Sequence, residues 1–253
     1  MRPIHLFPSL EGQLLCPSRY WRGNVLRELV QAPLARFFVG RWVHQCIAMA
    51  LQGHPLDPYR PIPWPRQVVL NDGEDLESLE SHAHSALERF AREYLDWLRA
   101  RGAVAEERLE TGLEVLGRPV VLSGRVDARV GNRVWDWKTG SLEGCADQLQ
   151  EYLFLLYQQG QNPAQACAVN LHSGEQHVEA WDENLIEVIL DRLKLRLEGL
   201  LRITPEHHPP RPGRHCRFCL YAPTCPESQS PRRVVVNTRT GEADDLARRG
   251  AVD

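Results

Sequence analysis

The stretch at 124–140 reads GRVDARVGNRVWDWKTG, and its pattern decides the fold. β-favouring residues fill both halves, and the Gly-Asn pair between them is typical of a tight hairpin turn. Because side chains alternate along a strand, Asp136 and Lys138 are expected on one face of the second strand. Asp127 can reach the same place from the first strand. The pattern therefore predicts a hairpin on which two acids and one lysine converge.

This combination of groups suits metal-assisted hydrolysis of a phosphodiester. Hard cations such as Mg²⁺ or Mn²⁺ prefer carboxylate oxygens, and a lysine can orient or deprotonate the attacking water and offset transition-state charge. A salt-bridged surface hairpin is the alternative interpretation. However, Trp135 and Trp137 alternate onto the opposite face, which suggests that this face is buried, and Val134 makes the acid-bearing face partly apolar. Buried acids are rare unless they are paired or metal-bound, so the pattern favours a catalytic site.

The surrounding residues predict a mixed α/β domain. Apolar residues at helical spacing predict helices within 24–52, divided at Pro33, and a long amphipathic helix over 76–97. The following segments predict strands at 104–109, 119–130 and 133–137, a helix at 143–159, a strand hairpin at 165–171 and 177–181, and a helix at 183–202. The predicted core is therefore α-β-β-β-α-β with flanking helices.

Composition limits the classes of function. The formal net charge of −3 argues against a protein that coats DNA through bulk positive charge, so any contact with nucleic acid must be local. No apolar run approaches the roughly 20 residues needed to cross a bilayer. The first residues, MRPIHLFPSL, lack the pattern of a secretory signal. We therefore expect a cytoplasmic protein without a membrane span.

Three motifs together resemble those of RecB-type nucleases, a branch of the PD-(D/E)XK superfamily. The hairpin resembles the G-x-x-D…D-Y-K-T-G signature, Gln148-Leu-Gln-Glu-Tyr152 matches the Q-x-x-x-Y motif that follows it, and Gly40-Arg-Trp-Val-His44 resembles the upstream G-x-x-x-H element. Taken alone, the histidine fits a core residue and the Q-x-x-x-Y motif fits a solvated helix face. The resemblance implies a restriction-endonuclease-like core, a central mixed sheet flanked by helices. It also implies that His44 is a further metal ligand and that Gln148 and Tyr152 contact the substrate backbone.

Four of the seven cysteines are candidates for a metal centre. Cys216, Cys219 and Cys225 have C-x2-C-x5-C spacing, and Cys16 lies about two hundred residues earlier. Four thiolates suit either a [4Fe–4S] cluster or Zn²⁺, so the residues alone leave the metal open. RecB-like exonucleases, including the AddB subunit and CRISPR-associated members, carry one cysteine before the nuclease core and three after it. The resemblance therefore implies a [4Fe–4S] cluster, with Zn²⁺ as the alternative.

The sequence as a whole predicts a metal-dependent deoxyribonuclease. We expect one nuclease domain over residues 1–226, with its catalytic core at about 100–202. The polar tail at 227–253 should form either a short strand, around the apolar residues Val234–Val236, or a loosely held segment. Asp127, Asp136 and Lys138 are the expected catalytic residues. The resemblance implies an exonuclease acting on single-stranded DNA ends, in DNA repair or CRISPR adaptation. Because no P-loop motif is present, unwinding would require a helicase partner, and a CRISPR-adaptation protein is the other partner considered. The alternative function is a catalytically silent DNA-end-binding or scaffold module, which the intact acids and lysine disfavour.

Overall fold

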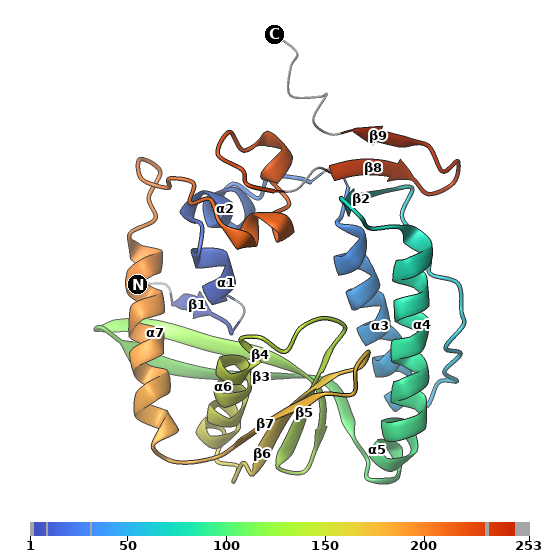
Figure 1. Ribbon diagram of the computed structural model, residues 1–253. Helices are drawn as coiled ribbons and strands as arrows, with labels where there is room; N and C mark the ends of the chain where they lie inside the picture. Colours follow the sequence, from blue (N-terminus) through green and yellow to red (C-terminus); the bar gives the residue numbers. More distant parts are fainter. Residues whose placement is uncertain (1–2, 9, 31, 231–232, 246–253) are drawn as a thin grey trace. The chain divides into compact units, whose positions relative to one another are not determined.

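The computed structural model describes residues 3–8, 10–30, 32–230 and 233–245 (Figure 1). Contacts divide the chain into two compact units, each assembled from several chain segments. Unit 1 comprises Met1–Leu10, Trp42–Arg60 and His82–Glu198, and unit 2 comprises Glu11–Arg41, Pro61–Ser81 and Gly199–Asp253. The segments of the two units interleave along the chain. The expected single domain over residues 1–226, with a tail from residue 227, stays a prediction.

Unit 1 contains a six-stranded mixed sheet. Its strands are β1 (Ile4–Leu6), β3 (Val104–Val115), β4 (Arg118–Val130), β5 (Arg133–Lys138), β6 (Gln165–Asn170) and β7 (Gln176–Ala180). The long strand β4 pairs antiparallel with β3 along one edge, and its other edge pairs with parallel β1 and antiparallel β5. Strand β5 then pairs parallel with β6, and β6 pairs antiparallel with β7. The predicted hairpins and the mixed sheet are confirmed.

Helices connect and cover these strands. The helical elements are α3 (Ala35–Leu51), α4 (Leu76–Phe90), η2 (Ala91–Leu95), α5 (Asp96–Ala100), α6 (Cys145–Gln158) and α7 (Leu185–Leu201). Helix α6 links β5 to the parallel strand β6 and contacts β3 to β7 (Figure 1). The sequence α4, η2, α5 forms the long helix predicted over 76–97, with one π-helical turn inside it. The predicted α-β-β-β-α-β core is therefore confirmed.

The prediction of a helix before Pro33 is wrong. The chain forms a π-helical turn, η1 (Trp21–Val25), and the described residues from 26 to 34 are not helical. Helix α3 begins only at Ala35. The helical path ends at Arg27, whose φ of 51° is left-handed, and Pro33 in addition disfavours the helical conformation of the residue before it.

The face of β5 that lies opposite the acids is packed against helical residues. Trp137 is fully buried, and its ring centroid lies 5.2 Å from those of Phe90 and Tyr94. Trp135 meets Trp97 of α5 at 5.5 Å between ring centroids. The expected burial of this face is confirmed at Trp137, and the packing fixes the strand that carries the acids.

Unit 2 contains a smaller antiparallel sheet and several short helices. The sheet consists of β2 (Gln67–Asn71), β8 (Arg233–Asn237) and β9 (Ala243–Asp245). The short helical elements are α1 (Leu10–Leu14), α2 (Pro17–Tyr20), η1, η3 (Arg214–Phe218) and η4 (Ala222–Thr224). The strand expected around Val234–Val236 is confirmed as β8. Within the described ranges, no helix has both the length and the apolar character needed to cross a bilayer.

Candidate active site

Three acids occupy matching positions on three neighbouring strands of unit 1. The strand register places Glu106 of β3 opposite Asp127 of β4, and the next step of the β4–β5 register places Asp127 opposite Asp136 of β5. Residues directly opposite each other on adjacent strands share a face of the sheet. The hairpin prediction thus holds for Asp127 and Asp136, and the structure adds a third carboxylate.

Asp127 is held by two contacts. Its Oδ2 accepts a hydrogen bond of 2.6 Å from the backbone N–H of Trp137, and its Oδ1 lies 3.0 Å from Nδ1 of His44 on α3. Burial by itself would lower the pKa of His44, but the hydrogen bond and charge of Asp127 outweigh it, and the pKa is raised. The structure therefore brings His44 to the acids, where the resemblance implied a ligand.

Glu106 is the site residue that sequence reasoning missed. A carboxylate oxygen of Glu106, a carboxylate oxygen of Asp127 and a ring nitrogen of His44 all lie within 4.8 Å of one another. The backbone of Glu106 has φ of 54°, which is uncommon for a non-glycine residue and often occurs at functional sites. Its sequence context, AEERLE, reads as a solvated strand edge. Only the position of Glu106 opposite Asp127 in the strand register indicates that it belongs to the site.

Asp136 is 3% exposed and forms an ion pair with Lys138, with 2.6 Å between Oδ2 and Nζ. Burial and the negative charge of Asp127 raise the pKa of Asp136 to about 6, although Lys138 and His44 act in the opposite direction. Among the residues that the structure describes, none donates a hydrogen bond of good geometry to Oδ2. Burial beside a second carboxylate disfavours the ionised form of Asp136, and a divalent cation would relieve this cost. The donor set therefore fits Mg²⁺ or Mn²⁺, which take oxygen ligands.

The side chains of the Q-x-x-x-Y motif lie on α6 and point to the lysine. Lys138 Nζ donates to Gln148 Oε1 at 2.7 Å, Gln148 Nε2 donates to the Tyr152 hydroxyl at 2.6 Å, and this hydroxyl donates to the backbone carbonyl of Arg125 at 2.9 Å. Tyr152 is only 3% exposed. The Tyr152 ring is buried and its hydroxyl is bonded within the protein, and the expected contact of Tyr152 with the substrate backbone stays a prediction.

The four predicted cysteines lie together in unit 2. Cys16, Cys216, Cys219 and Cys225 line one small cavity, and all four are free thiols. Backbone N–H groups approach two of the sulfurs, that of Arg211 at 3.5 Å from Cys16 Sγ and that of Gly213 at 3.4 Å from Cys216 Sγ. Cysteines from opposite ends of the chain thus face the same cavity, as the ligands of one metal centre must. The donor set fits a thiolate-ligated metal or cluster.

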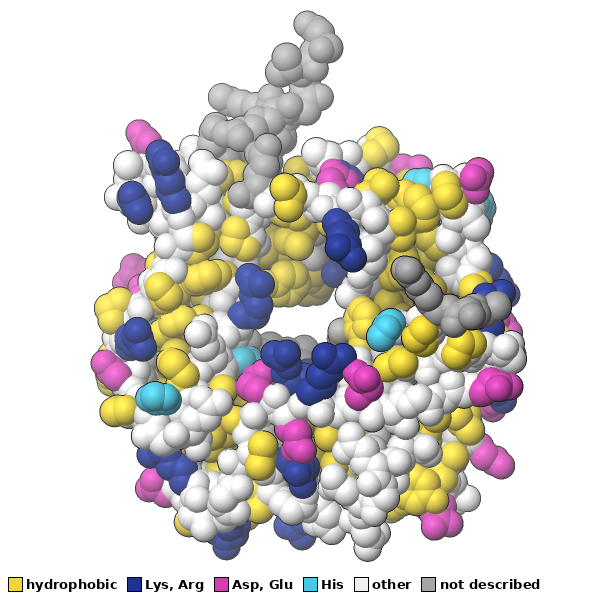
Figure 2. Space-filling model, turned by 180° about the vertical axis from the view of Figure 1, so that it is seen from behind, with side chains coloured by type: hydrophobic (Ala, Val, Ile, Leu, Met, Phe, Trp, Pro, Cys, Tyr) yellow, Lys and Arg dark blue, Asp and Glu magenta, His cyan; other side chains and the backbone are white. Residues whose placement is uncertain are grey.

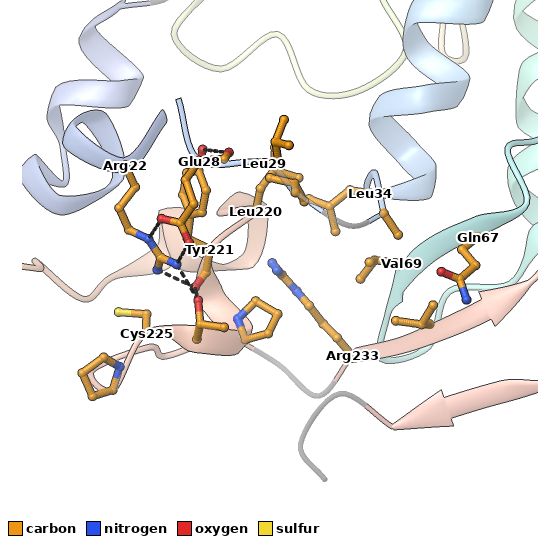
Figure 3. Close-up of a pocket in the computed structure, with 16 residues that line it drawn as sticks. Arg22, Glu28, Leu29, Leu34, Gln67, Val69, Leu220, Tyr221, Cys225 and Arg233 are labelled. Carbon is orange, nitrogen blue, oxygen red and sulfur yellow. Dashed lines mark hydrogen bonds and ion pairs between the residues drawn. The ribbon is translucent and has the colours of Figure 1, made fainter. Parts of the chain in front are cut away.

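A buried arginine, also unforeseen from the sequence, holds the loop that carries these cysteines. Arg233, the first residue of β8, is 5% exposed and extends away from the strand (Figure 3). Its guanidinium donates to the carbonyls of Cys216 at 3.0 Å, Arg217 at 2.8 Å and Cys219 at 2.6 Å, and its Nε donates to Asn71 Oδ1 at 3.0 Å. Burial lowers the pKa of Arg233, whereas the nearby Cys219 raises it. Nothing in the local sequence marks this residue.

An α-β-β-β-α-β core with paired acids and a lysine at its centre defines a class of nuclease-like folds. A family model described as the PD-(D/E)XK nuclease superfamily matches residues 8–226. The chain belongs to this superfamily. Among curated proteins, none gives a significant match.

Two solved structures align with most of this chain. A "Putative exonuclease" from Eubacterium rectale aligns with a TM-score of 0.53 and 13% identity, covering 85% of each chain. The protein SSO0001 aligns with a TM-score of 0.46 and 15% identity, covering 90% of this chain and 88% of its own. At these identities the likeness concerns the fold alone.

Proposed function

We propose that this protein is a metal-dependent DNA nuclease that hydrolyses phosphodiester bonds at single-stranded DNA ends. The observation that carries the proposal is the buried pair Asp127 and Asp136, in register on adjacent strands, with Lys138 in contact with Asp136. Membership of the PD-(D/E)XK superfamily supports a nuclease. The sequence resemblance to RecB-like exonucleases supports single-stranded ends as the substrate and DNA repair or CRISPR adaptation as the role.

In this proposal, Mg²⁺ or Mn²⁺ is held by His44, Asp127 and Asp136, with Glu106 as a further ligand. When bound, such a cation polarises the scissile phosphate and lowers the pKa of a coordinated water. Lys138 lies beside the ligand Asp136, where its ammonium group can orient the attacking water and offset charge on the phosphate. The protein contributes by fixing the positions of these groups before substrate arrives.

The surface charge is compatible with local rather than bulk contact to DNA. On the face in Figure 2, basic and acidic side chains are scattered singly or in small groups among uncharged ones, and the whole chain carries a formal charge of −3. Affinity for nucleic acid comes mainly from neutralised phosphates, so this protein should bind a short stretch of DNA near its site. A helicase or CRISPR-adaptation protein would then supply unwound ends.

We further propose a [4Fe–4S] cluster at Cys16, Cys216, Cys219 and Cys225. A single Zn²⁺ with bonds of about 2.3 Å would hold four sulfurs roughly 3.8 Å apart. No three of these described cysteines bring their sulfurs within 4.8 Å of one another. A cubane cluster spreads its four thiolates farther apart than one ion does. This arrangement is compatible with the cluster, the resemblance to RecB-like exonucleases supports it, and metal analysis distinguishes it from zinc.

The test is cleavage of end-labelled single-stranded and duplex DNA by anaerobically purified protein with Mn²⁺, and with EDTA as the control. We expect cleavage of single-stranded ends with Mn²⁺ and none with EDTA. Asp136→Ala and Lys138→Ala should abolish cleavage while leaving DNA binding largely intact, because both groups act on the reacting phosphate. Binding without cleavage by the wild type would instead identify a silent DNA-end-binding or scaffold module.

A further inference from the structure

The lysine relay, formed by Lys138, Gln148, Tyr152 and the backbone carbonyl of Arg125, allows only one arrangement of its protons. An ammonium group can only donate, so Gln148 must present Oε1 to Lys138. The amide Nε2 of Gln148 must then donate to the hydroxyl of Tyr152. The single hydroxyl proton of Tyr152 is left for the carbonyl of Arg125. Every hydrogen bond in the relay therefore has a fixed direction.

The relay joins helix α6 to the strand that carries Asp127. Arg125 precedes Asp127 by two residues on β4, and Lys138 follows Asp136 by two residues on β5. The ion pair with Asp136 fixes Lys138 Nζ from one side, and Gln148 fixes it from another. A lysine has a long, flexible side chain, so a second anchor restricts where its ammonium group can lie.

Gly124 provides the space that the Tyr152 ring requires. A Cβ atom at Gly124 would lie 2.9 Å and 3.1 Å from two ring carbons of Tyr152, and 3.2 Å from Cδ1 of Leu155. Contacts below 3.0 Å are not tolerated, so any larger residue would displace the ring. The glycine of G-x-x-D and the tyrosine of Q-x-x-x-Y thus form one packed unit across α6 and β4.

We propose that Gln148 and Tyr152 are positioning residues, which hold the catalytic lysine against the acids, and that Gly124 is required to seat Tyr152. This inference rests on the proposed nuclease function and assigns the Q-x-x-x-Y motif a role other than substrate contact. Tyr152 is 3% exposed, and both polar ends of Gln148 are occupied inside the protein. Their effect on hydrolysis is transmitted through Lys138.

The functional test compares Gln148→Met, Gln148→Glu and Tyr152→Phe with the wild type on single-stranded DNA. DNA affinity is measured with Ca²⁺ in place of Mn²⁺, and single-turnover cleavage is measured at saturating DNA with Mn²⁺. Loss of orientation at a reacting group costs up to about 100-fold in rate. We expect about a 100-fold slower rate for Gln148→Met and about a tenfold slower rate for Tyr152→Phe, with DNA affinity unchanged.

Gln148→Glu tests the lysine contact directly, because it keeps an oxygen acceptor for Lys138. It should cleave faster than Gln148→Met. The matched control is Tyr157→Phe on the same helix, whose ring is exposed and stacks on Trp181, and it should behave as the wild type. Weakened DNA affinity with an unchanged single-turnover rate would overturn the proposal, since that result identifies substrate contacts. Equal rates for Gln148→Met and Gln148→Glu would also overturn it.

A melting experiment separates failure of this inference from failure of the nuclease proposal. Gly124→Ala should lower the melting temperature, and the loss should be much smaller when Tyr152→Ser is present, because the clashing ring is gone. Lys138→Met and Gln148→Met together should lower the melting temperature by less than the sum of their separate effects. If the wild type cleaves no nucleic acid, the nuclease proposal fails while these two comparisons still test the relay. Additive losses for Gly124→Ala and Tyr152→Ser would reject the role of Gly124, and additive losses for Lys138→Met and Gln148→Met would reject the relay.

Discussion

Asp136 is a buried acid of the candidate active site, and its burial lowers the stability of the fold at high pH. The pKa of about 6, against the ordinary 3.8, arises from burial beside Asp127 and means that folding favours the neutral carboxyl. Its contribution to stability is therefore full below pH 3.8 and is lost as the pH rises through about 6. The shift of the pKa from 3.8 to about 6 corresponds to a loss of up to about 3 kcal/mol in the free energy of unfolding at high pH. A residue kept despite this cost is typical of a functional site.

Asp136→Asn should therefore stabilise the metal-free protein while it abolishes cleavage. In EDTA at pH 8, we expect the free energy of unfolding to rise by up to about 3 kcal/mol, and the gain should shrink toward pH 4, where the wild-type carboxyl is protonated. Urea unfolding at both pH values measures this. A variant less stable than the wild type at pH 8 would contradict the assigned burial cost.

A second prediction at the residue scale concerns Glu106. If it is a ligand, Glu106→Gln should weaken Mn²⁺ binding by at least about tenfold in calorimetry, without unfolding the protein. Glu110 lies on the same strand in an exposed ion pair with Arg108, so Glu110→Gln is the matched control and should bind Mn²⁺ as the wild type does. Equal affinities for the two variants would remove Glu106 from the metal site.

At the scale of elements, α6 and α7 are joined by a buried ion pair. Glu151 and Arg196 are almost fully buried, with contacts of 2.6 and 3.0 Å between carboxylate oxygens and guanidinium nitrogens. Removing one partner of such a pair costs about 3–5 kcal/mol, because the other charge stays buried. We expect Glu151→Ala to lower the free energy of unfolding by this amount in urea. Glu187→Ala, on the exposed side of α7, should change it little.

A second prediction at this scale concerns strand β8, which Arg233 links to the cysteine loop. Arg233→Met leaves three loop carbonyls without their donor, so the loop should lose order and metal content. Arg233→Lys should rescue little, since an ammonium group cannot reproduce the planar fork. Metal analysis and melting temperature are the measurements, and exposed Arg239→Met is the control. Unchanged metal content in Arg233→Met would show that the loop holds its shape alone.

At the scale of the whole molecule, the acids and lysine lie in one compact unit and the four cysteines in the other. A centre at the cysteines would close a loop of about two hundred residues, and such closure stabilises by restricting the unfolded chain. Hydrolysis of a phosphodiester needs no iron–sulfur cluster, so we expect loss of the centre to slow cleavage only by destabilising the protein.

Cys219→Ala should therefore lose iron, melt at a lower temperature and cleave DNA more slowly. The anaerobic wild type should be brown and contain about four irons per chain. One zinc and no iron would replace the cluster with a structural zinc site. Well-folded, active wild type with neither metal would reject the centre altogether.

Local pattern was sufficient to predict the hairpin, its acids and lysine, and the α-β-β-β-α-β order. Alternation, helical spacing and turn residues act over a few residues, so the chain itself displays them. The prediction failed before Pro33 because apolar spacing continues there, whereas Arg27 adopts a left-handed φ of 51° that ends the helical path.

Only the tertiary structure decided the partners of these residues. Glu106 reaches the acids through pairing of β3 with β4, Tyr152 is buried because α6 packs over Gly124, and Arg233 binds loop carbonyls 14–17 residues away. Each depends on strand register or on contacts between distant segments, which no local period encodes. The sequence by itself determined which groups could carry the chemistry, and long-range packing determined which of them meet.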